Sequence, residues 1–493
     1  MVEGKHESPR RRATAPLIVA LIVALGASAA CGAQGRTLTS SGASDMSMRA
    51  QLCGDEHGAA DERIRACSTI IKDGGLRGRD LANTYLHRAR AARSVHDNEG
   101  AARDLDLATK VDERYAVPYF ERANFRADDG DNRGALEDYD RAIQMKATYP
   151  EFFINRGNTH KDLGDKDAAL VDYGKAIELD PKSAAAYFNR SGLYLKDDKL
   201  DAAIRDLDRA IELDPYNPEQ FYARGTALLR KGDSGKALAD LDEALRMRPS
   251  FAAAFVARGR ALESRGETDR ALADYSEAIN LNPASPALES RARLLIAKGD
   301  FDEAIKDLDQ AIANDPTNAG VLNNRGVAYV SRQDYASAVA DFTRATELAP
   351  AFADAWFNRG SAYEKMKSPD RALHDYDQAI NLNSSYAAAY FNRGGIHLAQ
   401  KHYTPSLEDY SRAIELTPTD AAAWFKRGNV HLDLHEFESA AADYGEAIRI
   451  DSSHAVALYN RSLAYARLGK RTLSAQDYAR AIKLDPTLAK GTR

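Results

Sequence analysis

Small and apolar residues recur along most of the chain at helical spacings, in pairs of short stripes separated by a turn. In residues 356–382, Trp356, Gly360 and Tyr363 lie at steps of four and three, which places them on one face of a helix. After a break at 367–369, the second stripe consists of Ala372, Tyr376 and Ala379. Pro369 suits a first helical turn, and Ser368 before it can cap a helix. The pattern therefore predicts two short amphipathic helices joined by a tight turn.

The same pattern recurs in twelve units. Each unit has an arginine in the first helix, followed by Gly, Ala or Ser, and an alanine twenty residues further on. The twelve arginines are Arg88, Arg122, Arg156, Arg190, Arg224, Arg258, Arg291, Arg325, Arg359, Arg393, Arg427 and Arg461. Every step is 34 residues except that from Arg258 to Arg291, which is 33. A single hairpin cannot bury its own apolar stripe, whereas stacked copies can.

Trp356, Gly360, Tyr363, Ala372, Tyr376 and Ala379 match the signature of the tetratricopeptide repeat, which has a 34-residue period. The chain resembles this family over residues 82–488. Arg359 stands where the family usually has Leu, and Ser384 where it usually has Pro. The resemblance implies an all-α fold, a right-handed α-solenoid superhelix of about twelve 34-residue helix-turn-helix repeats.

The N-terminal segment predicts export. Residues 1–30 combine Arg10–Arg12, an apolar run from Pro16 to Leu25, and small residues before a cleavage site, as in a signal peptide. Cys31 follows directly and resembles the lipidated cysteine of bacterial lipoproteins, although Ser28 stands where a large apolar residue is usual. We expect a periplasmic or envelope-anchored protein, with simple secretion as the second choice and an uncleaved anchor as a third.

Residues 31–49 are rich in Gly, Ser and Thr, and this composition predicts a flexible tether. Residues 50–81 form a degenerate unit that we expect to cap the stack. Cys53 and Cys67 lie in this unit, and in an exported protein the pair is expected to form a disulfide. The alternative is two buried, reduced thiols.

An aspartate recurs in the second helix of every unit, sixteen residues after the arginine. Arg359 lies between Trp356 and Tyr363, so it leans toward the packing face, where an unpaired charge would be costly. We expect an Arg–Asp pair that links the helices within one unit or between neighbours. The alternative is that the arginines bind an acidic ligand.

The residue before the arginine varies, and it is Asn in six units. In the tetratricopeptide family the first helices line a groove, and Asn at this place resembles the asparagines that hold extended peptides. The resemblance, together with the adjacent aromatics, implies a peptide-binding groove that contains Asn155, Asn189, Asn324, Phe357, Asn358, Phe391, Asn392, Phe425 and Asn460. The alternative is that Asn tolerates an exposed helix face and that the aromatics pack between units.

The row of asparagines is interrupted. Ala223, Ala257 and Ser290 replace Asn near the 33-residue step, and Lys426 replaces it once more. Two grooves are one interpretation of the central interruption, and a local change in superhelical pitch is the other.

The chain shows no chemistry typical of an enzyme. It contains no Gly-rich phosphate loop, no G-x-S-x-G and no C-x-x-C motif. His431 and His435 are four residues apart, but His431 occupies the position of Tyr363 in its unit, and no third ligand is evident. We therefore expect no catalytic residues, no cofactor and no metal site. A net charge of −6 argues against nucleic acid as the main partner.

The repeats end close to the C-terminus, and residues 489–493 form a short tail that cannot build a capping helix. We expect an apolar edge there that docks a partner or self-associates. The whole pattern predicts a non-catalytic scaffold in the cell envelope that binds extended peptide segments or assembles a complex, with proteins or peptides as partners and membrane contact only through a lipid anchor. A structural, self-assembling envelope component and an accessory subunit of an envelope enzyme are the alternatives.

Overall fold

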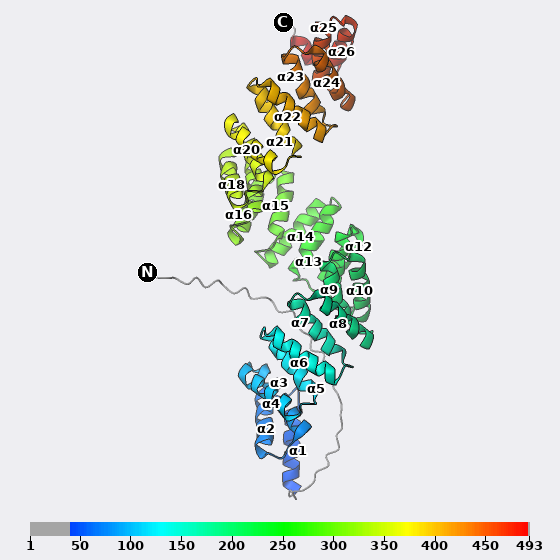
Figure 1. Ribbon diagram of the computed structural model, residues 1–493, viewed down its shortest axis with the longest axis vertical. Helices are drawn as coiled ribbons and strands as arrows, with labels where there is room; N and C mark the ends of the chain where they lie inside the picture. The colour runs from blue at the N-terminus through cyan, green and yellow to red at the C-terminus, as the bar shows by residue number, and fades with distance from the viewer. Residues whose placement is uncertain (1–39, 492–493) are drawn as a thin grey trace, which may run out of the picture. The chain divides into compact units, whose positions relative to one another are not determined.

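The structure is a computed structural model that describes residues 40–491, with side chains from 45 to 489. Every secondary-structure element in this range is helical, and consecutive helices pair into stacked hairpins (Figure 1). The predicted α-solenoid of helix-turn-helix repeats is therefore confirmed. The predicted signal peptide and Cys31 lie outside the described residues.

The chain divides into two compact units, residues 1–147 and 148–493. The described helices of the first unit are α1 (Ser40–Gly54), α2 (Ala60–Asp73), α3 (Gly78–Ser94), α4 (Asn98–Val111), α5 (Ala116–Asp128) and α6 (Asn132–Met145). The second unit begins with α7 (Pro150–Asp162), α8 (Lys166–Leu179), α9 (Ala184–Lys196), α10 (Leu200–Leu213), α11 (Pro218–Arg230), α12 (Ser234–Met247), α13 (Ala252–Ser264), α14 (Thr268–Leu281), α15 (Ala287–Lys298) and α16 (Phe301–Asn314). It continues with α17 (Ala319–Ser331), α18 (Tyr335–Leu348), α19 (Ala353–Lys365), α20 (Pro369–Leu382), α21 (Ala387–Ala399), α22 (Tyr403–Leu416), α23 (Ala421–Asp433), α24 (Phe437–Ile450), α25 (Ala455–Arg467), α26 (Arg471–Leu484) and the 3₁₀ helix η1 (Pro486–Gly491).

Local signals set the turn inside each hairpin. Gly164 adopts a φ of +83°, and the side chain of Asp165 after it accepts a hydrogen bond from the backbone N–H of Ala168, which caps α8. The same aspartate cap opens α4, α6, α12 and α18. Pro369 begins α20 as expected, but the side chain of Ser368 makes no capping hydrogen bond, so that detail of the prediction is wrong.

Small residues allow the two helices of a hairpin to approach closely. A Cβ atom added to Gly360 would lie 3.0 Å from the ring of Tyr376, and one added to Gly326 would lie 2.5 Å from the ring of Phe342. Ala372 and Tyr376 are fully buried on the facing helix. The small residue after each arginine is thus required by packing wherever a large ring opposes it.

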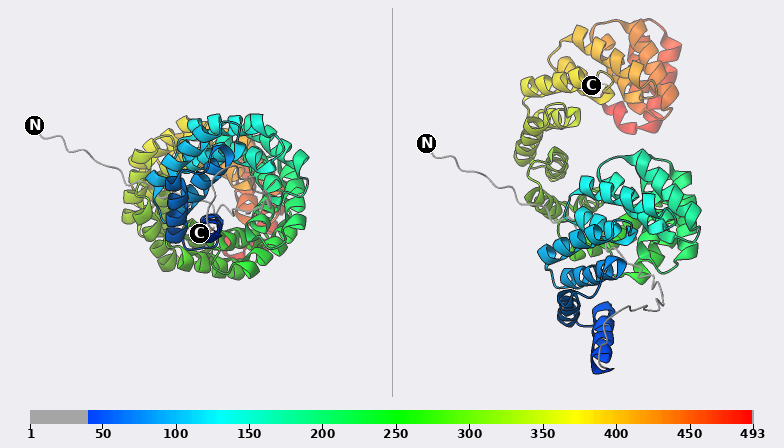
Figure 2. Two further views of the ribbon diagram at one scale, coloured as in Figure 1. Left: turned by 90° about the horizontal axis from the view of Figure 1, so that it is seen from below. Right: turned by 60° about the horizontal axis from the view of Figure 1, so that its bottom comes forward.

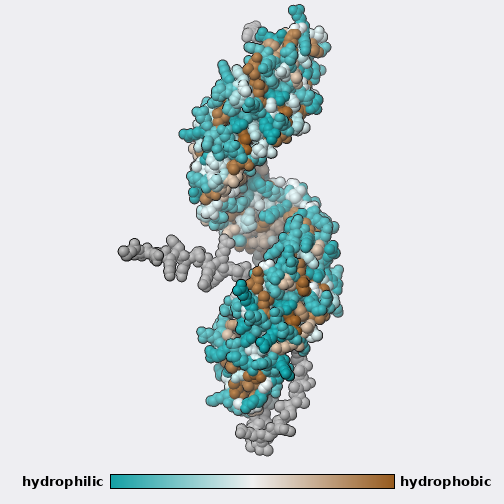
Figure 3. Space-filling view, in the orientation of Figure 1, coloured by the Kyte–Doolittle hydropathy of each residue, from teal (hydrophilic) through white to brown (hydrophobic). Residues whose placement is uncertain are grey.

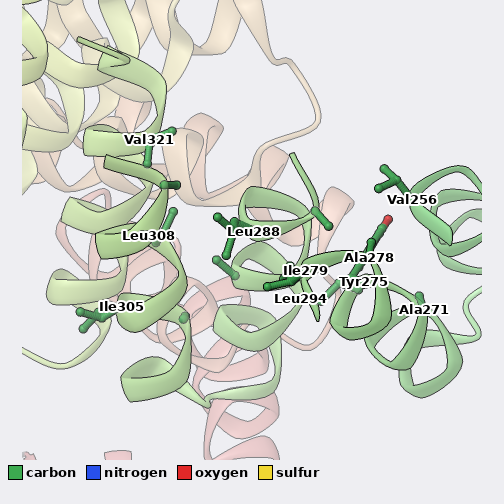
Figure 4. Packing of buried hydrophobic residues seen from close by; sticks show 14 of the residues in the cluster. Val256, Ala271, Tyr275, Ala278, Ile279, Leu288, Leu294, Ile305, Leu308 and Val321 are labelled. Atoms are coloured by element: carbon green, nitrogen blue, oxygen red, sulfur yellow. The ribbon is translucent and has the colours of Figure 1, made fainter. Parts of the chain in front are cut away.

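The 33-residue step has a simple structural origin. α15 has twelve residues, whereas the other first helices of the second unit have thirteen. Apolar side chains from α13 to α17 close around the shortened helix, with Leu288 and Leu294 among Ile279, Leu308 and Val321 (Figure 4). The irregular repeat therefore has a buried apolar core of its own.

In the second unit, first helices of successive hairpins contact one another, as α7 does with α9 and α23 with α25. No comparable contact joins successive second helices among the described residues. The first helices therefore crowd together on the inner side of the stack, and Figure 2 shows the same hairpins from two further directions. The asparagines and aromatics of the predicted groove all belong to first helices of the second unit.

The first and last elements differ in part from expectation. Cys53 on α1 and Cys67 on α2 form a disulfide, with 5.0 Å between their Cα atoms. The predicted flexible tether is wrong for residues 40–49, which belong to α1. The reason is that α1 packs on α2 and is joined to it by the disulfide, so this segment has a helical partner. At the other end, Leu488 of η1 packs against the apolar cluster of α24–α26, so part of the last hairpin is covered.

Candidate functional site

The recurrent arginine and aspartate form the same bidentate ion pair in all twelve units, which we call the clasp. In each unit Nε and Nη2 of the arginine donate to the two carboxylate oxygens of the aspartate sixteen residues later, at 2.5 to 2.9 Å. The aspartates are buried. In Arg258, the hydrogen bond to Asp274 raises the pKa of the guanidinium, which therefore stays charged. The structural interpretation of this pair fits the geometry.

The clasp also connects neighbouring hairpins. The remaining Nη1 of Arg224 donates to Asp208, and that of Arg325 to Asp309, each on the second helix of the preceding hairpin. Arg359 makes the equivalent contact with Thr343 and Thr346 hydroxyls at 3.2 Å. The arginine thus joins the two helices of one hairpin and also joins neighbouring hairpins. The sequence had left both arrangements open.

The asparagines of the groove are held by hydrogen bonds to the preceding hairpin. Nδ2 of Asn189 donates to Oδ1 of Asn158 at 3.1 Å, and Nδ2 of Asn460 donates to Oδ1 of Asn429 at 3.0 Å. Asn358 donates to Asn323 at 2.9 Å. All of these pairs bridge successive first helices, so they lie on the inner face of the second unit.

Buried tyrosines form the floor beneath these asparagines. The hydroxyl of Tyr173 donates to Asn158 at 2.7 Å and that of Tyr444 to Asn429 at 2.8 Å, while Asn392 donates to the hydroxyl of Tyr376 at 3.2 Å. Burial raises the pKa of the Tyr173, Tyr376 and Tyr444 hydroxyls, so they remain neutral. The tyrosine thereby fixes which end of the amide points to the floor.

The network leaves a donor and an acceptor side by side. Oδ1 of Asn158 accepts both hydrogen bonds, so its Nδ2 has no partner among the described residues, and the same holds for Oδ1 of Asn189. Asn429 and Asn460 repeat this arrangement in the eleventh and twelfth units. An amide donor beside an amide acceptor is complementary to the C=O and N–H of one peptide group.

Sequence reasoning missed Asn158, Asn429 and Asn323. Asn158 and Asn429 stand two residues after a clasp arginine, which places them one short step along the same helix face as the predicted asparagines. The recurrence of Asn there, also at Asn124, was a signal that could have found them.

The other predicted site residues are placed as follows. Asn155 on α7 and Asn324 on α17 are half-buried, and the side-chain amide of Asn324 makes no hydrogen bond within residues 45–489. Phe357 packs on Tyr376 and Tyr386, with ring centroids 5.7 and 4.9 Å apart. Phe391 lies 5.6 Å from Tyr410, and Phe425 lies 5.9 Å from Tyr444 and 4.8 Å from His454. These three aromatics are half-buried between hairpins, which is the arrangement that the packing alternative describes.

The floor changes at the Lys426 interruption. Gly395 stands where Asn158 and Asn429 stand in their units, and the buried hydroxyl of Tyr410 consequently has no hydrogen-bond partner. Lys426, the residue equivalent to Asn392 in the next hairpin, forms no ion pair in the described part of the chain. This step of the groove therefore differs chemically from those on either side.

At the central interruption, charged side chains take over. Arg293 of α15 pairs with Glu263 of α13 at 2.6 Å, and Glu263 accepts from the hydroxyl of Tyr275 at 3.0 Å. Here an ion pair, instead of an asparagine pair, bridges two successive first helices. Whether the two flanking stretches act as separate grooves stays a prediction.

The remaining surface shows little other organised chemistry. On the face drawn in Figure 3, apolar residues form small patches separated by hydrophilic ones. Within the described range, no group of three or more His, Cys, Asp or Glu side chains is arranged to hold a metal. His431 instead contacts Glu436, with 2.6 Å between Nδ1 and the carboxylate. No helix among residues 40–491 has the length and apolar character needed to cross a membrane.

Known proteins resemble this chain through its repeats. A tetratricopeptide repeat profile matches residues 154–218, 222–286, 290–351 and 425–489, a second matches residues 353–386, and a TPR repeat profile matches residues 396–434. No curated protein matches the chain.

Among solved structures, "YrrB: a TPR protein with an unusual peptide-binding site" is 24% identical, over 40% of this chain and 99% of its own, with a TM-score of 0.34. Yeast Tom70 is 15% identical over 83% and 98%, with a TM-score of 0.39. A tetratricopeptide repeat protein from Parabacteroides merdae is 21% identical over 50% and 98%, with a TM-score of 0.41.

The first profile alone covers more than half of the sequence, and all of its matches fall on the helical hairpins of the second unit. This chain belongs to the tetratricopeptide repeat family.

Proposed function

We propose that the protein is a non-catalytic scaffold that binds extended peptide segments along the inner face of its second unit. Membership of the tetratricopeptide repeat family supports a protein-interaction role in general. The observation that carries the more specific proposal is the oriented amide pair, Asn158 with Asn189 and Asn429 with Asn460.

A preorganised amide pair suits a backbone ligand. The fold consumes one hydrogen-bonding group of each asparagine and leaves the other available, so binding does not require the side chains to find new rotamers. An extended peptide presents C=O and N–H groups at regular intervals, and half-buried amides along successive first helices can satisfy them without reading the peptide's sequence.

We also propose that the protein works in the cell envelope, attached through a lipid on Cys31 or released after export. The basic and apolar N-terminal sequence supports export. The Cys53–Cys67 disulfide supports an oxidising compartment, because such bonds persist there and are rare in reducing ones. Labelling with a radioactive fatty acid, compared between the natural sequence and Cys31→Ala, tests the anchor: equal labelling of both would reject it.

The test of the groove is a comparison of retained peptides. A library of extended peptides derived from envelope proteins is passed over the immobilised protein and over Asn189→Ala/Asn460→Ala, which removes one member of each amide pair. Asn381→Ala is the control, because Asn381 is an exposed asparagine on α20, the second helix of its hairpin, and makes no hydrogen bond in the described structure.

We expect the wild type and the control to retain the same peptides, and the double variant to lose at least about tenfold in affinity, since two backbone contacts contribute about 1 kcal/mol each. Retention by a folded double variant equal to that of the wild type would reject the peptide-binding proposal and favour a structural role.

A further inference from the structure

Arg63 on α2 is a buried arginine whose guanidinium has unpartnered donors. Its side chain is buried, with 6% exposed, yet Nε and Nη2 have no hydrogen-bond partner. These are the two atoms with which all twelve clasp arginines hold a carboxylate. A guanidinium stays protonated in a protein, so burying it without a counter-charge is costly. The edge of Arg63 that binds a carboxylate in every clasp therefore faces no carboxylate among the described residues.

His87 on α3 is near enough to Arg63 for the two side chains to interact electrostatically. Its Nδ1 is also buried without a partner, and Nε2 lies 4.0 Å from the position that a Cβ atom on Gly54 would take, against the end of α1. Burial first, and then the charges of Arg90 and Arg63, lower the pKa of His87, so the imidazole is neutral at pH 7. The nearby carboxylates are already engaged, because Arg90 binds Glu56 at 2.8 Å and Glu121 at 2.5 Å.

α1 covers this pair but is weakly packed. Met46, Met48 and Leu52 are exposed at 39, 62 and 39%. Cys53 is the sole member that the described part of α1 contributes to the buried cluster with Ala66, Cys67 and Ile70. A helix with so few buried apolar contacts opens readily.

The remaining polar link is exposed. Arg49 lies 3.5 Å from Asp73, and both side chains are more than a third exposed, so this pair contributes little. The disulfide is therefore the principal tie of α1. Arg63 and Cys67 are four residues apart on α2, so the disulfide holds α1 directly over the unpaired guanidinium.

We propose that Arg63 and His87 form a carboxylate-binding site beneath α1, which the Cys53–Cys67 disulfide keeps closed. A dithiol reductant opens it: two electrons and two protons pass to the disulfide, giving two cysteine thiols and the oxidised reductant. Without the covalent tie, the cost of the buried charge favours lifting α1, and the exposed edge binds a carboxylate as the clasps do. This inference does not rest on the proposed groove.

A carboxylate fits better than a phosphate. The site offers one guanidinium and one neutral imidazole, which matches a single negative charge, and the same Nε–Nη2 edge takes carboxylates throughout the chain. The carboxylate can come from a small metabolite or from an acidic side chain of a partner. Acetate and a short blocked peptide with one aspartate are the two probes that distinguish these sources.

The experiment measures hydrogen exchange of residues 45–54 in the full chain, before and after reduction with dithiothreitol and in Cys53→Ser/Cys67→Ser. We expect exchange about tenfold faster once the disulfide is absent. Adding Arg63→Met to the serine variant restores slow exchange, because the buried charge is removed. Arg65→Met, on the exposed face of the same helix, does not.

Binding of the two probes to the serine variant is then followed by calorimetry at constant ionic strength. Both probes binding indicates a small-molecule source as well as a protein one, and the peptide alone indicates a partner protein. Arg63→Lys keeps the charge and lacks the bidentate edge, so it opens α1 but weakens binding about tenfold. Slow exchange in the serine variant, fast exchange that Arg63→Met leaves unchanged, or no binding of either probe would each overturn the proposal.

Discussion

The clasp arginine and the residue just before it, which we call the groove rung, occupy adjacent positions in every first helix, yet they behave differently. The arginine is present in all twelve units and makes the same bidentate bond each time. The residue just before it is Asn in six units and His, Glu, Ala, Ser or Lys in the others. One position points between helices, where only a paired charge is tolerated, and the other points to the inner face, where the fold accepts many side chains. Positions at which the fold tolerates variation are those available for recognition.

The largest expected effect breaks the clasp. Asp375→Ala leaves Arg359 half-buried without its carboxylate, and we expect the free energy of unfolding to fall by about 3–5 kcal/mol. Urea denaturation followed by circular dichroism measures it. Asp377→Ala, which removes an exposed partner of Arg393, is the control and should cost under about 1 kcal/mol. Equal losses in the two variants would contradict the distinction.

The next effect tests the close approach of the helices. Gly326→Ala places a methyl group 2.5 Å from the ring of Phe342, and we expect a loss of about 1–3 kcal/mol from overpacking. Gly192→Ala, where a Cβ atom meets no other atom within 4 Å, is the matched control. The same denaturation measurement would show comparable stability for both variants if the small residues were not required by packing.

The groove rung should show the opposite balance. Asn358→Ala removes one hydrogen bond to Asn323, so we expect a cost of only about 0.5–1.5 kcal/mol in stability. Asn189→Ala/Asn460→Ala also removes one hydrogen bond at each site, yet this variant should lose peptide affinity as described above. A stability loss as large as that of Asp375→Ala would move this rung from recognition to structure.

The smallest effect concerns His87. It occupies the groove-rung position of the first repeat but is covered by α1. Its pKa is lowered in the folded state, so the unfolded chain binds a proton more readily. The stability that neutral His87 contributes is therefore complete above about pH 6.5 and declines as the pH falls below that value. His87→Gln should remove this part of the pH dependence between pH 7 and 5, seen as a smaller shift of the thermal midpoint. An unchanged shift would place the titrating group elsewhere.

The sequence by itself determined the repeat, the pairing of helices and the existence of a recurrent arginine and aspartate between them. These features follow from spacing alone, because residues at steps of three and four share a helix face and a 34-residue period brings equivalent faces together. The Cys53–Cys67 pairing could also be anticipated, since two cysteines fall in one short unit.

Only the tertiary structure decided which atoms meet. It showed that each arginine uses one edge within its hairpin and, in many units, its third nitrogen on the preceding one. It showed that Asn158 and Asn429 orient the predicted asparagines, and that Phe357, Phe391 and Phe425 pack on rings of the floor. The unpaired guanidinium of Arg63 could not be foreseen either. Pairing and burial depend on the distance between side chains of different helices, and a one-dimensional pattern specifies faces but not those distances.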